Sequence, residues 1–436
     1  MADQKINWDQ CLQHAVISDI GMRRSNNQDS YAVTISNNNE DWHQRGHVFL
    51  VADGMGAHAA GELASKIAAD QIPHLYLKHR ELSAPEALQR AVIETNAEVH
   101  RKGQANLDFH NMGTTCSVLT LLPQGAVLAH IGDSRVYRLR GDHFEQLTFD
   151  HSLVWEMRET GQLAENSELA ASLPKNVITR SLGPNATVKV DIEGPFPTEV
   201  GDTFLLCSDG LTGKVSDEEI GPIIANLPPE EAARALVDIA NLRGGPDNIT
   251  IVIAKVIGPE ITTRVAATEP ITVGGEKEER KVHPALWASL GAFVLAAVGM
   301  LAAQNIPAAG VAGVGALVLL VIVLIKAFNE SGSGVMVGAG QRFGRGPYVR
   351  IASAASEKVV DELIDIMQQL RDAAIEQKWN VDWEHVDSLC GSGDAAKSSG
   401  NLGRTVSNYA RAVSFMMEQL RTKGKNKGDE SAIDHN

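Results

Sequence analysis

An apolar segment that ends in a carboxylate constrains the fold more than any other feature of this sequence. In VFLVADGMGAHAAGELAS, residues 48–65, an almost unbroken apolar run ends at Asp53 and leads through glycines into a helical pattern. Asp-Gly is a common turn dipeptide, but Asp133, Asp209 and Asp247 also lie at the ends of apolar strand patterns. The tips of neighbouring strands lie about 4.8 Å apart. A sheet could therefore bring these four carboxylates into one pocket.

Such a cluster indicates a bound cation. Buried carboxylates without partners repel one another and raise each other's pKa values. Ligation by oxygen alone favours Mg²⁺ or Mn²⁺ over zinc. The four cysteines are far apart in the sequence, which predicts reduced thiols in a cytosolic setting and no zinc cluster. The formal net charge of -15 argues against nucleic acid as a partner.

The 436 residues divide into stretches of different character. Residues 12–257 alternate short apolar strand patterns with helical patterns, as in a mixed domain of helices and sheets. Residues 258–283 have few large apolar side chains and are predicted to be a flexible linker. Two uncharged runs follow at 285–303 and 308–325. Residues 329–436 begin with a Gly-rich segment and continue with helical periodicity, which predicts a small helical C-terminal region.

The two uncharged runs predict a pair of transmembrane helices. At about 1.5 Å per residue, each run is about long enough to cross a hydrocarbon core of about 30 Å. The polar break at 304–307 contains a proline and suits a tight turn between them. Basic residues on both flanks place both ends in the cytoplasm. The N-terminus has no secretory signal pattern. We therefore expect a membrane protein with two spans (285–325) and a cytoplasmic catalytic domain. The alternative is a pair of buried helices in a soluble domain.

Eight motifs, taken together, identify a family. They are GMRRSNNQDS (21–30), VADGMGAHAAGELAS (51–65), MGTTCSVLTL (112–121), IGDSRVYRLR (131–140), LTFDHSLV (147–154), ITRSLG (178–183), LLCSDGLTGKVSDEEI (205–220) and GGPDNITIVI (244–253). In this order they resemble the type 2C, or PPM, metal-dependent serine/threonine protein phosphatases of bacteria. The resemblance implies an α+β fold, an αββα sandwich of two antiparallel sheets flanked by helices. In this chain the sandwich would precede the transmembrane hairpin and the helical C-terminal region.

The resemblance also implies a metal site. Its ligands would be Asp29, Asp53, Gly54, Asp133, Asp209 and Asp247. Asp53 would bridge two ions, Gly54 would bind through its carbonyl, and Asp29 would act through water. Asp133 belongs to a third, looser ion in bacterial members. Gln28 stands where many members carry Glu, so the second ion is expected to bind less tightly. Gly213 stands where some carry an aspartate for the third ion. Two ions, Mn²⁺ or Mg²⁺, are predicted, and a third is doubtful.

Two further residues acquire catalytic roles from the resemblance. Arg24 would contact the substrate phosphate, and its planar guanidinium suits phosphate better than a lysine does. His58 would be the general acid for the departing serine or threonine oxygen; the alternative is a loop histidine that only caps or packs. The two cations would activate a bridging hydroxide as the nucleophile. A thiol phosphatase is excluded, because Gly213 stands six residues after Cys207, where that mechanism needs an arginine.

The predicted function is hydrolysis of phosphoserine and phosphothreonine in proteins, the substrates of a serine/threonine kinase, at the cytoplasmic face of a membrane. The alternative is a pseudophosphatase that acts as a membrane-bound phosphoprotein-binding scaffold. Residues 155–177 resemble the family's variable flap beside the active site. No implied ligand lies beyond Asp247, so a chain truncated after residue 283 is expected to stay active. Residues 329–436 could bind a partner or only stabilise the protein.

Overall fold

The computed structural model describes the chain apart from residues 1–6, 57–58, 164–172, 175–176, 264–270, 274–283, 305, 309–311, 318–319, 321–334, 338–340 and 432–436. It forms two compact units. One contains Met1–Ile271 together with Val337–Asn436, and the other contains Thr272–Met336. The first unit holds every described candidate site residue.

Two antiparallel sheets form the centre of the first unit. The first sheet has the order β1 (Leu12–Asp19), β11 (Ile249–Val256), β10 (Thr203–Cys207), β7 (Arg135–Arg140), β8 (His143–Gln146), β14 (Val349–Ala352). The second has the order β2 (Asp29–Thr34), β3 (His47–Met55), β5 (Cys116–Leu122), β6 (Gly125–Ile131), β9 (Asp191–Phe196), and the short β4 (Gly113–Thr114) pairs with β3.

The sheets face each other across an apolar core. Phe49 and Leu119 of the second sheet and Phe204 and Val252 of the first are fully buried in the same cluster. Val48 to Ala52 of β3 are all fully buried, which explains why this strand reads as a continuous apolar run. The starts of two helices also follow from short sequence patterns. Helix α3 (Ala84–Ala105) begins with a capping box of Ser83 and Glu86, and helix α7 (Asp217–Asn226) begins with one of Ser216 and Glu219.

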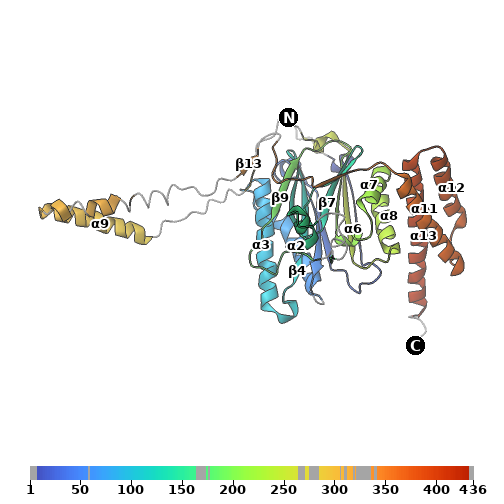
Figure 1. Cartoon of the computed structure of the whole chain (residues 1–436), viewed down its shortest axis with the longest axis horizontal. Coiled ribbons are helices and arrows are strands. Elements are labelled where there is room, and N and C mark those ends of the chain that lie inside the picture. Colours follow the sequence, from blue (N-terminus) through green and yellow to red (C-terminus); the bar gives the residue numbers. More distant parts are fainter. Residues whose placement is uncertain are drawn as a thin grey trace. The chain divides into compact units, whose positions relative to one another are not determined.

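Helices cover the outer faces of both sheets (Figure 1). Helices α2 (Ala60–Lys78) and α3 (Ala84–Ala105) lie on the second sheet, and α7 (Asp217–Asn226) and α8 (Pro229–Leu242) lie on the first. The shorter helices are η1 (Trp8–Gln10), α1 (Asn39–Arg45), η2 (Leu107–Phe109), α4 (Leu153–Glu159), α6 (Asp209–Thr212) and η3 (Pro259–Ile261). The expected two-sheet α+β sandwich is confirmed.

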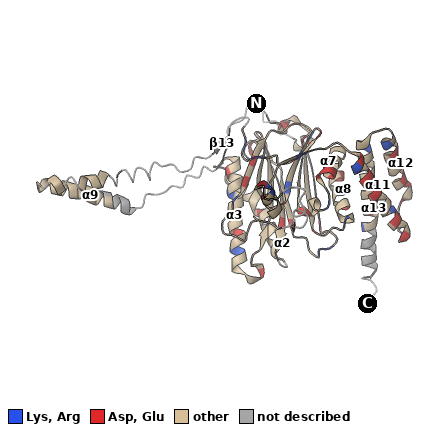
Figure 2. Cartoon of the chain, in the orientation of Figure 1, with Lys and Arg blue, Asp and Glu red and all other residues tan. Residues whose placement is uncertain are grey.

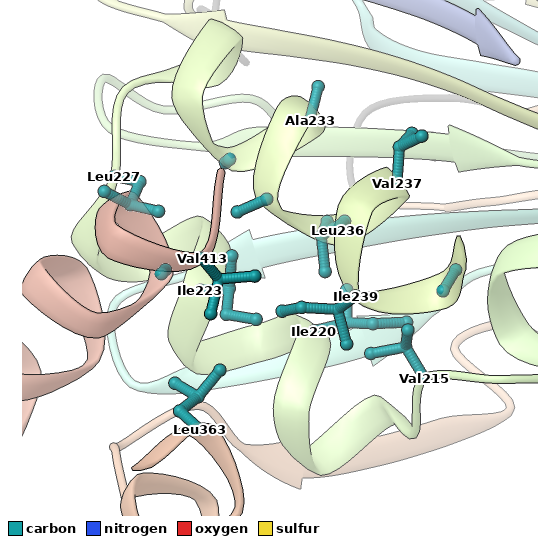
Figure 3. Close-up of a cluster of buried hydrophobic side chains, with 14 of the residues drawn as sticks. Val215, Ile220, Ile223, Leu227, Ala233, Leu236, Val237, Ile239, Leu363 and Val413 are labelled. Atoms are coloured by element: carbon teal, nitrogen blue, oxygen red, sulfur yellow. The ribbon is translucent and has the colours of Figure 1, made fainter. Parts of the chain in front are cut away.

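The C-terminal helices add a further layer to the first unit. They are α11 (Glu357–Glu376), α12 (Trp383–Ser398) and α13 (Leu402–Ser431). They pack on α7 and α8, and one buried cluster joins Leu363 and Val413 to Ile223 and Leu236 (Figure 3). Strand β14, which precedes them, extends the first sheet beyond β8. The C-terminal region therefore shares its core with the sandwich.

The second unit does not bear out the transmembrane hairpin. It contains α9 (Pro284–Ala302) and the paired strands β12 (Ile271–Val273) and β13 (Val335–Val337). Helix α9 carries no charged residue (Figure 2), yet no helix in the described part of the chain is long and apolar enough to span a bilayer. Much of the second predicted span, 308–325, lies outside the described residues.

The predictions of two spans and of a membrane location are therefore wrong. They relied on the absence of charge. Crossing a bilayer requires strong apolarity sustained over a whole helix of about 20 residues, and no helix in the described part of the chain meets that requirement.

Candidate active site

The register of β2 and β3 places two of the predicted site residues face to face. Asp29, the first residue of β2, pairs with Asp53 near the end of β3. Gly54 follows within the strand and pairs with Thr114 of β4. The Asp-Gly pair is thus part of an extended strand and not of a turn. The Asp53 backbone is held on both sides, because its N–H donates to Thr115 Oγ1 at 2.9 Å and its carbonyl accepts from the Thr115 N–H at 2.8 Å.

Three more carboxylates reach the same edge of the sandwich. Asp209 begins α6 just after β10, and Asp247 lies two residues before β11. These strands are antiparallel neighbours, so the end of one meets the beginning of the other. Asp133 lies in the connection from β6 to β7, which joins the two sheets at this edge. The topology therefore brings together aspartates separated by more than 200 positions in the sequence.

The electrostatics show that these carboxyl groups share one pocket. Burial raises the pKa of Asp53 well above its ordinary value, and the charges of Asp29, Asp209, Asp133 and Asp247 raise it further. Burial also raises the pKa of Asp29 to about 7, although Ser208 Oγ donates a hydrogen bond to its Oδ2 at 2.7 Å. The pKa of Asp133 rises to about 7, from burial and then from the charge of Asp209. These raised pKa values mean that a negative charge on one carboxyl group disfavours ionisation of the others.

Three oxygen atoms of this cluster have no hydrogen-bond partner. They are Oδ1 of Asp29, Oδ1 of Asp133 and Oδ1 of Asp209, all buried. A buried acceptor without a partner costs about 1–3 kcal/mol, and more when it is charged. Among the residues that the structure describes, no group of three or more His, Cys, Asp or Glu side chains is arranged to hold a metal ion as it stands. The fit to a hard cation therefore rests on the chemistry of these oxygen donors.

Close backbone contacts require glycine beside Asp53. A Cβ atom on Gly54 would lie 2.1 Å from the Gly61 carbonyl oxygen and 2.6 Å from that of Gln28. Helix α2 thus packs directly against the strand that carries the cluster. The glycines of DGMGAHAAGE serve this close approach.

Arg24 lies in the loop before β2, at the edge of the cluster. Its Nη2 donates to Asp247 Oδ2 at 2.7 Å, and its side chain is about half exposed. Asn248 fixes this loop. Its Nδ2 donates to the carbonyl oxygens of Ile20 and Asn26 at 2.9 and 3.0 Å, and its Oδ1 accepts from the Gln28 N–H at 2.8 Å. One buried amide therefore holds the loop that carries Arg24.

Sequence reasoning missed Asn248 and Ser208, each of which lies next to a predicted ligand. Ser208 joins the two sheets, because its Oγ donates to Asp29 and accepts from the Thr250 N–H at 2.9 Å. Both residues belong to the quoted motifs, as the Ser of SDG and the Asn of DN. Adjacency to a predicted ligand was the signal that could have found them.

The Asp133 loop is held by the segment that leads into α4. The His151 N–H donates to the Gly132 carbonyl at 2.7 Å, and the Gly132 N–H donates to His151 Nδ1 at 3.0 Å. Arg135 makes a bidentate pair with Asp150, with Nη2 to Oδ2 at 2.7 Å. Residues 164–172 and 175–176 of the predicted flap, and His58, lie outside the described residues.

We expect Asn248→Ala to weaken both the fold and phosphate recognition. Three backbone groups would lose a side-chain partner in partly buried hydrogen bonds, which costs about 1–3 kcal/mol in the free energy of unfolding. The loosened Arg24 loop should raise KM for a phosphorylated substrate more than it lowers kcat. Asn96→Ala is the matched control, because Asn96 also makes three hydrogen bonds to backbone groups, at residues 183, 185 and 186. An equal change in KM in both variants would contradict this role of Asn248.

Comparison with known proteins agrees with this fold. The family model described as protein phosphatase 2C matches residues 22–239. The chain is 39% identical over 239 residues to a putative protein phosphatase 2C-type of Streptococcus pyogenes, which covers 54% of this chain and 93% of that protein. It is 35% identical over 249 residues to the protein phosphatase PhpP of Streptococcus pneumoniae, which covers 56% of this chain and 97% of that protein.

A solved structure shows the same likeness. The crystal structure of the Mycobacterium tuberculosis serine/threonine phosphatase PstP/Ppp is 33% identical, with a TM-score of 0.50, and the match covers 57% of this chain and 100% of that one. The fold and the matches define a class of serine/threonine protein phosphatases. The chain belongs to the protein phosphatase 2C, or PPM, family of serine/threonine phosphatases, and it is an enzyme.

Proposed function

We propose that this phosphatase hydrolyses phosphoserine and phosphothreonine in proteins with the help of two divalent cations, Mn²⁺ or Mg²⁺. The observation that carries the proposal is the set of buried carboxyl oxygens without partners, in a cluster whose members raise each other's pKa values. A cation between the carboxylates would remove both costs at once.

Asp29, Asp53, Gly54, Asp209 and Asp247 would hold the two ions. Asp53 is the member whose pKa responds to the other four carboxylates, which suits a residue shared between the ions. Asp133 would bind any third ion. That ion would have fewer carboxylate ligands, because residue 213 is a glycine and supplies none. Bound cations supply positive charge to the phosphoryl oxygens and lower the pKa of water.

The side chains at the edge of the cluster would handle the substrate. Arg24 is half exposed and would donate to the phosphate through its planar fork. Its present partner, Asp247, would then hold a cation instead. The role of His58 as proton donor to the leaving oxygen rests on the resemblance alone. The substrates would be proteins phosphorylated by a serine/threonine kinase. We favour hydrolysis over the scaffold alternative, because every carboxylate that the resemblance implies is present in the sequence.

The full-length chain tests this proposal. With Mn²⁺ present, we expect release of phosphate from a phosphoserine peptide and from a generic aryl phosphate. Excess chelator should abolish both reactions, added Mn²⁺ should restore them, and Mn²⁺ should raise Tm. Full activity in chelator would contradict the role of the cations. A rise in Tm without turnover of either substrate would favour the scaffold.

A further inference from the structure

Residues 343–352, which we call the clasp, pair with strands of both sheets. Phe343 exchanges two backbone hydrogen bonds with Gly194 of β9, at the edge of the second sheet. A few residues later, β14 pairs with β8 of the first sheet. The clasp thus joins the two sheets on one side of the sandwich. It lies beyond residues 22–239, the part that the family model matches.

A buried glutamate anchors the middle of the clasp. Glu193 of β9 is 3% exposed, and its carboxylate accepts from the Gly346 N–H at 2.9 Å and from Tyr348 Oη at 2.5 Å. Gly344 has a φ of +69°, and a Cβ there would lie 2.0 Å from Glu193 Oε2. The Gly-rich sequence before the C-terminal helices therefore permits the chain to pass directly over this carboxylate.

The clasp also reaches helix α4 at two points. The Tyr348 ring packs edge-on against Phe149 at 5.5 Å, and Phe149 packs in the same way against Trp155 of α4 at 5.3 Å, both between ring centroids. Arg345 Nη1 donates to Glu159 Oε1, near the end of α4, at 2.5 Å. The Arg345 pair is exposed, so it adds little to stability.

The segment that enters α4 is the one that holds the Asp133 loop. Phe149 lies next to Asp150, the partner of Arg135, and His151 is hydrogen-bonded to Gly132. The clasp adds a backbone bond to the same region, because the Tyr348 N–H donates to the Gln146 carbonyl at 2.8 Å. A continuous set of contacts therefore runs from the C-terminal region to the edge of the candidate active site.

We propose that the clasp positions α4 for the binding of protein substrates, with Tyr348 and Arg345 as positioning residues. Neither residue touches the carboxylate cluster. A small aryl phosphate needs only the cluster and Arg24, whereas a phosphorylated peptide extends past them over the neighbouring surface. The C-terminal region would thus govern how well large substrates bind. This inference rests on the proposed phosphatase reaction, and hydrolysis of the aryl phosphate reports on that reaction separately.

The test compares Tyr348→Ala, Tyr348→Phe and Arg345→Ala in the full-length chain with Mn²⁺. We expect Tyr348→Ala to raise KM for a phosphoserine peptide by about fivefold, a typical size for such coupling, and to leave kcat/KM for an aryl phosphate unchanged. Trypsin should cleave faster after Arg158, an exposed residue of α4. Tyr348→Phe keeps the ring contact and loses the bond to Glu193, so it should fall between Tyr348→Ala and the unaltered protein.

Arg345→Ala separates positioning from damage to the fold, because its side chain is 70% exposed. It should reproduce the peptide-specific rise in KM and the faster cleavage to a smaller extent. Arg371→Ala is the matched control, since Arg371 also makes an exposed ion pair, with Asp387 at 2.7 Å between α11 and α12. Unchanged peptide KM in Tyr348→Ala and Arg345→Ala, or equal losses on both substrates, would overturn the proposal. Absence of aryl phosphate hydrolysis in the unaltered chain would instead count against the proposed reaction.

Discussion

Replacing Asp53 with asparagine is expected to abolish phosphatase activity while leaving the protein without cations as stable as before. Burial and the neighbouring carboxylates raise the pKa of Asp53 well above its ordinary value, so its charged form is disfavoured in the absence of cations and an amide of the same shape removes that cost. Activity should fall on the order of 10³-fold, about 4 kcal/mol, because the ligand that we propose both ions share would be lost. Phosphate release and thermal melts with and without Mn²⁺ measure the two effects.

The melts provide a readout that does not depend on turnover. Saturating Mn²⁺ should raise the Tm of the unaltered chain, by linkage worth about 2.7 kcal/mol at a hundred times Kd, and this rise should shrink in Asp53→Asn. Asp202→Asn is the control. Asp202 is also a buried carboxylate, but it pairs with Arg140 at the opposite end of β10. It should lower Tm and leave the response to Mn²⁺ intact. Near-normal turnover in Asp53→Asn would show that the site is misplaced.

Ending the chain after residue 263 is expected to prevent stable folding. This removes β14, the clasp and α11 to α13, and it exposes the faces of α7 and α8 that pack on them. Burial of one large apolar side chain contributes about 1.5–3 kcal/mol, and Ile223, Ile224 and Leu236 of α7 and α8 are nearly fully buried in the cluster that they share with the C-terminal helices. Exposing them would remove a large part of the stability of a typical domain, about 5–15 kcal/mol.

Solubility and thermal melts of the truncated and full-length chains would measure this effect. Two buried carboxylates would add to the loss of stability. Glu193 would lose its hydrogen bonds from Tyr348 and the Gly346 N–H, and Glu145 would lose its hydrogen bond from Arg350. Adding residues 341–436 as a separate polypeptide should restore folding if the lost contacts are the cause. A truncated chain that melts within a few degrees of the full-length protein and keeps its activity would contradict this expectation. The sequence alone predicts that outcome, since no implied ligand lies beyond Asp247.

The aspartates at the strand ends show which features local sequence patterns can predict and which they cannot. Apolar runs and capping boxes depend on residues a few positions apart, so the strands of the sandwich, helix α2 and the existence of a carboxylate pocket could be predicted. The pairing of Asp29 with Asp53 and the bridge from Ser208 to Asp29 could not, because they depend on register and on contacts across 179 positions. The transmembrane prediction rested on two uncharged runs, and no helix in the described residues has the length and apolarity that a span requires.

Short motifs of fixed spacing identify the family, and the resemblance that they carry implies the two-sheet fold and the residues proposed for the metal site. The effect of the C-terminal region on the sandwich depends instead on contacts between residues far apart in the sequence. Arg345 follows the second uncharged run in the sequence, and in the structure it pairs with Glu159, 186 positions away. Glu193 carries no motif, yet it anchors the clasp. Contacts of this kind depend on which edges and faces the folded strands and helices leave open, and no local pattern records that.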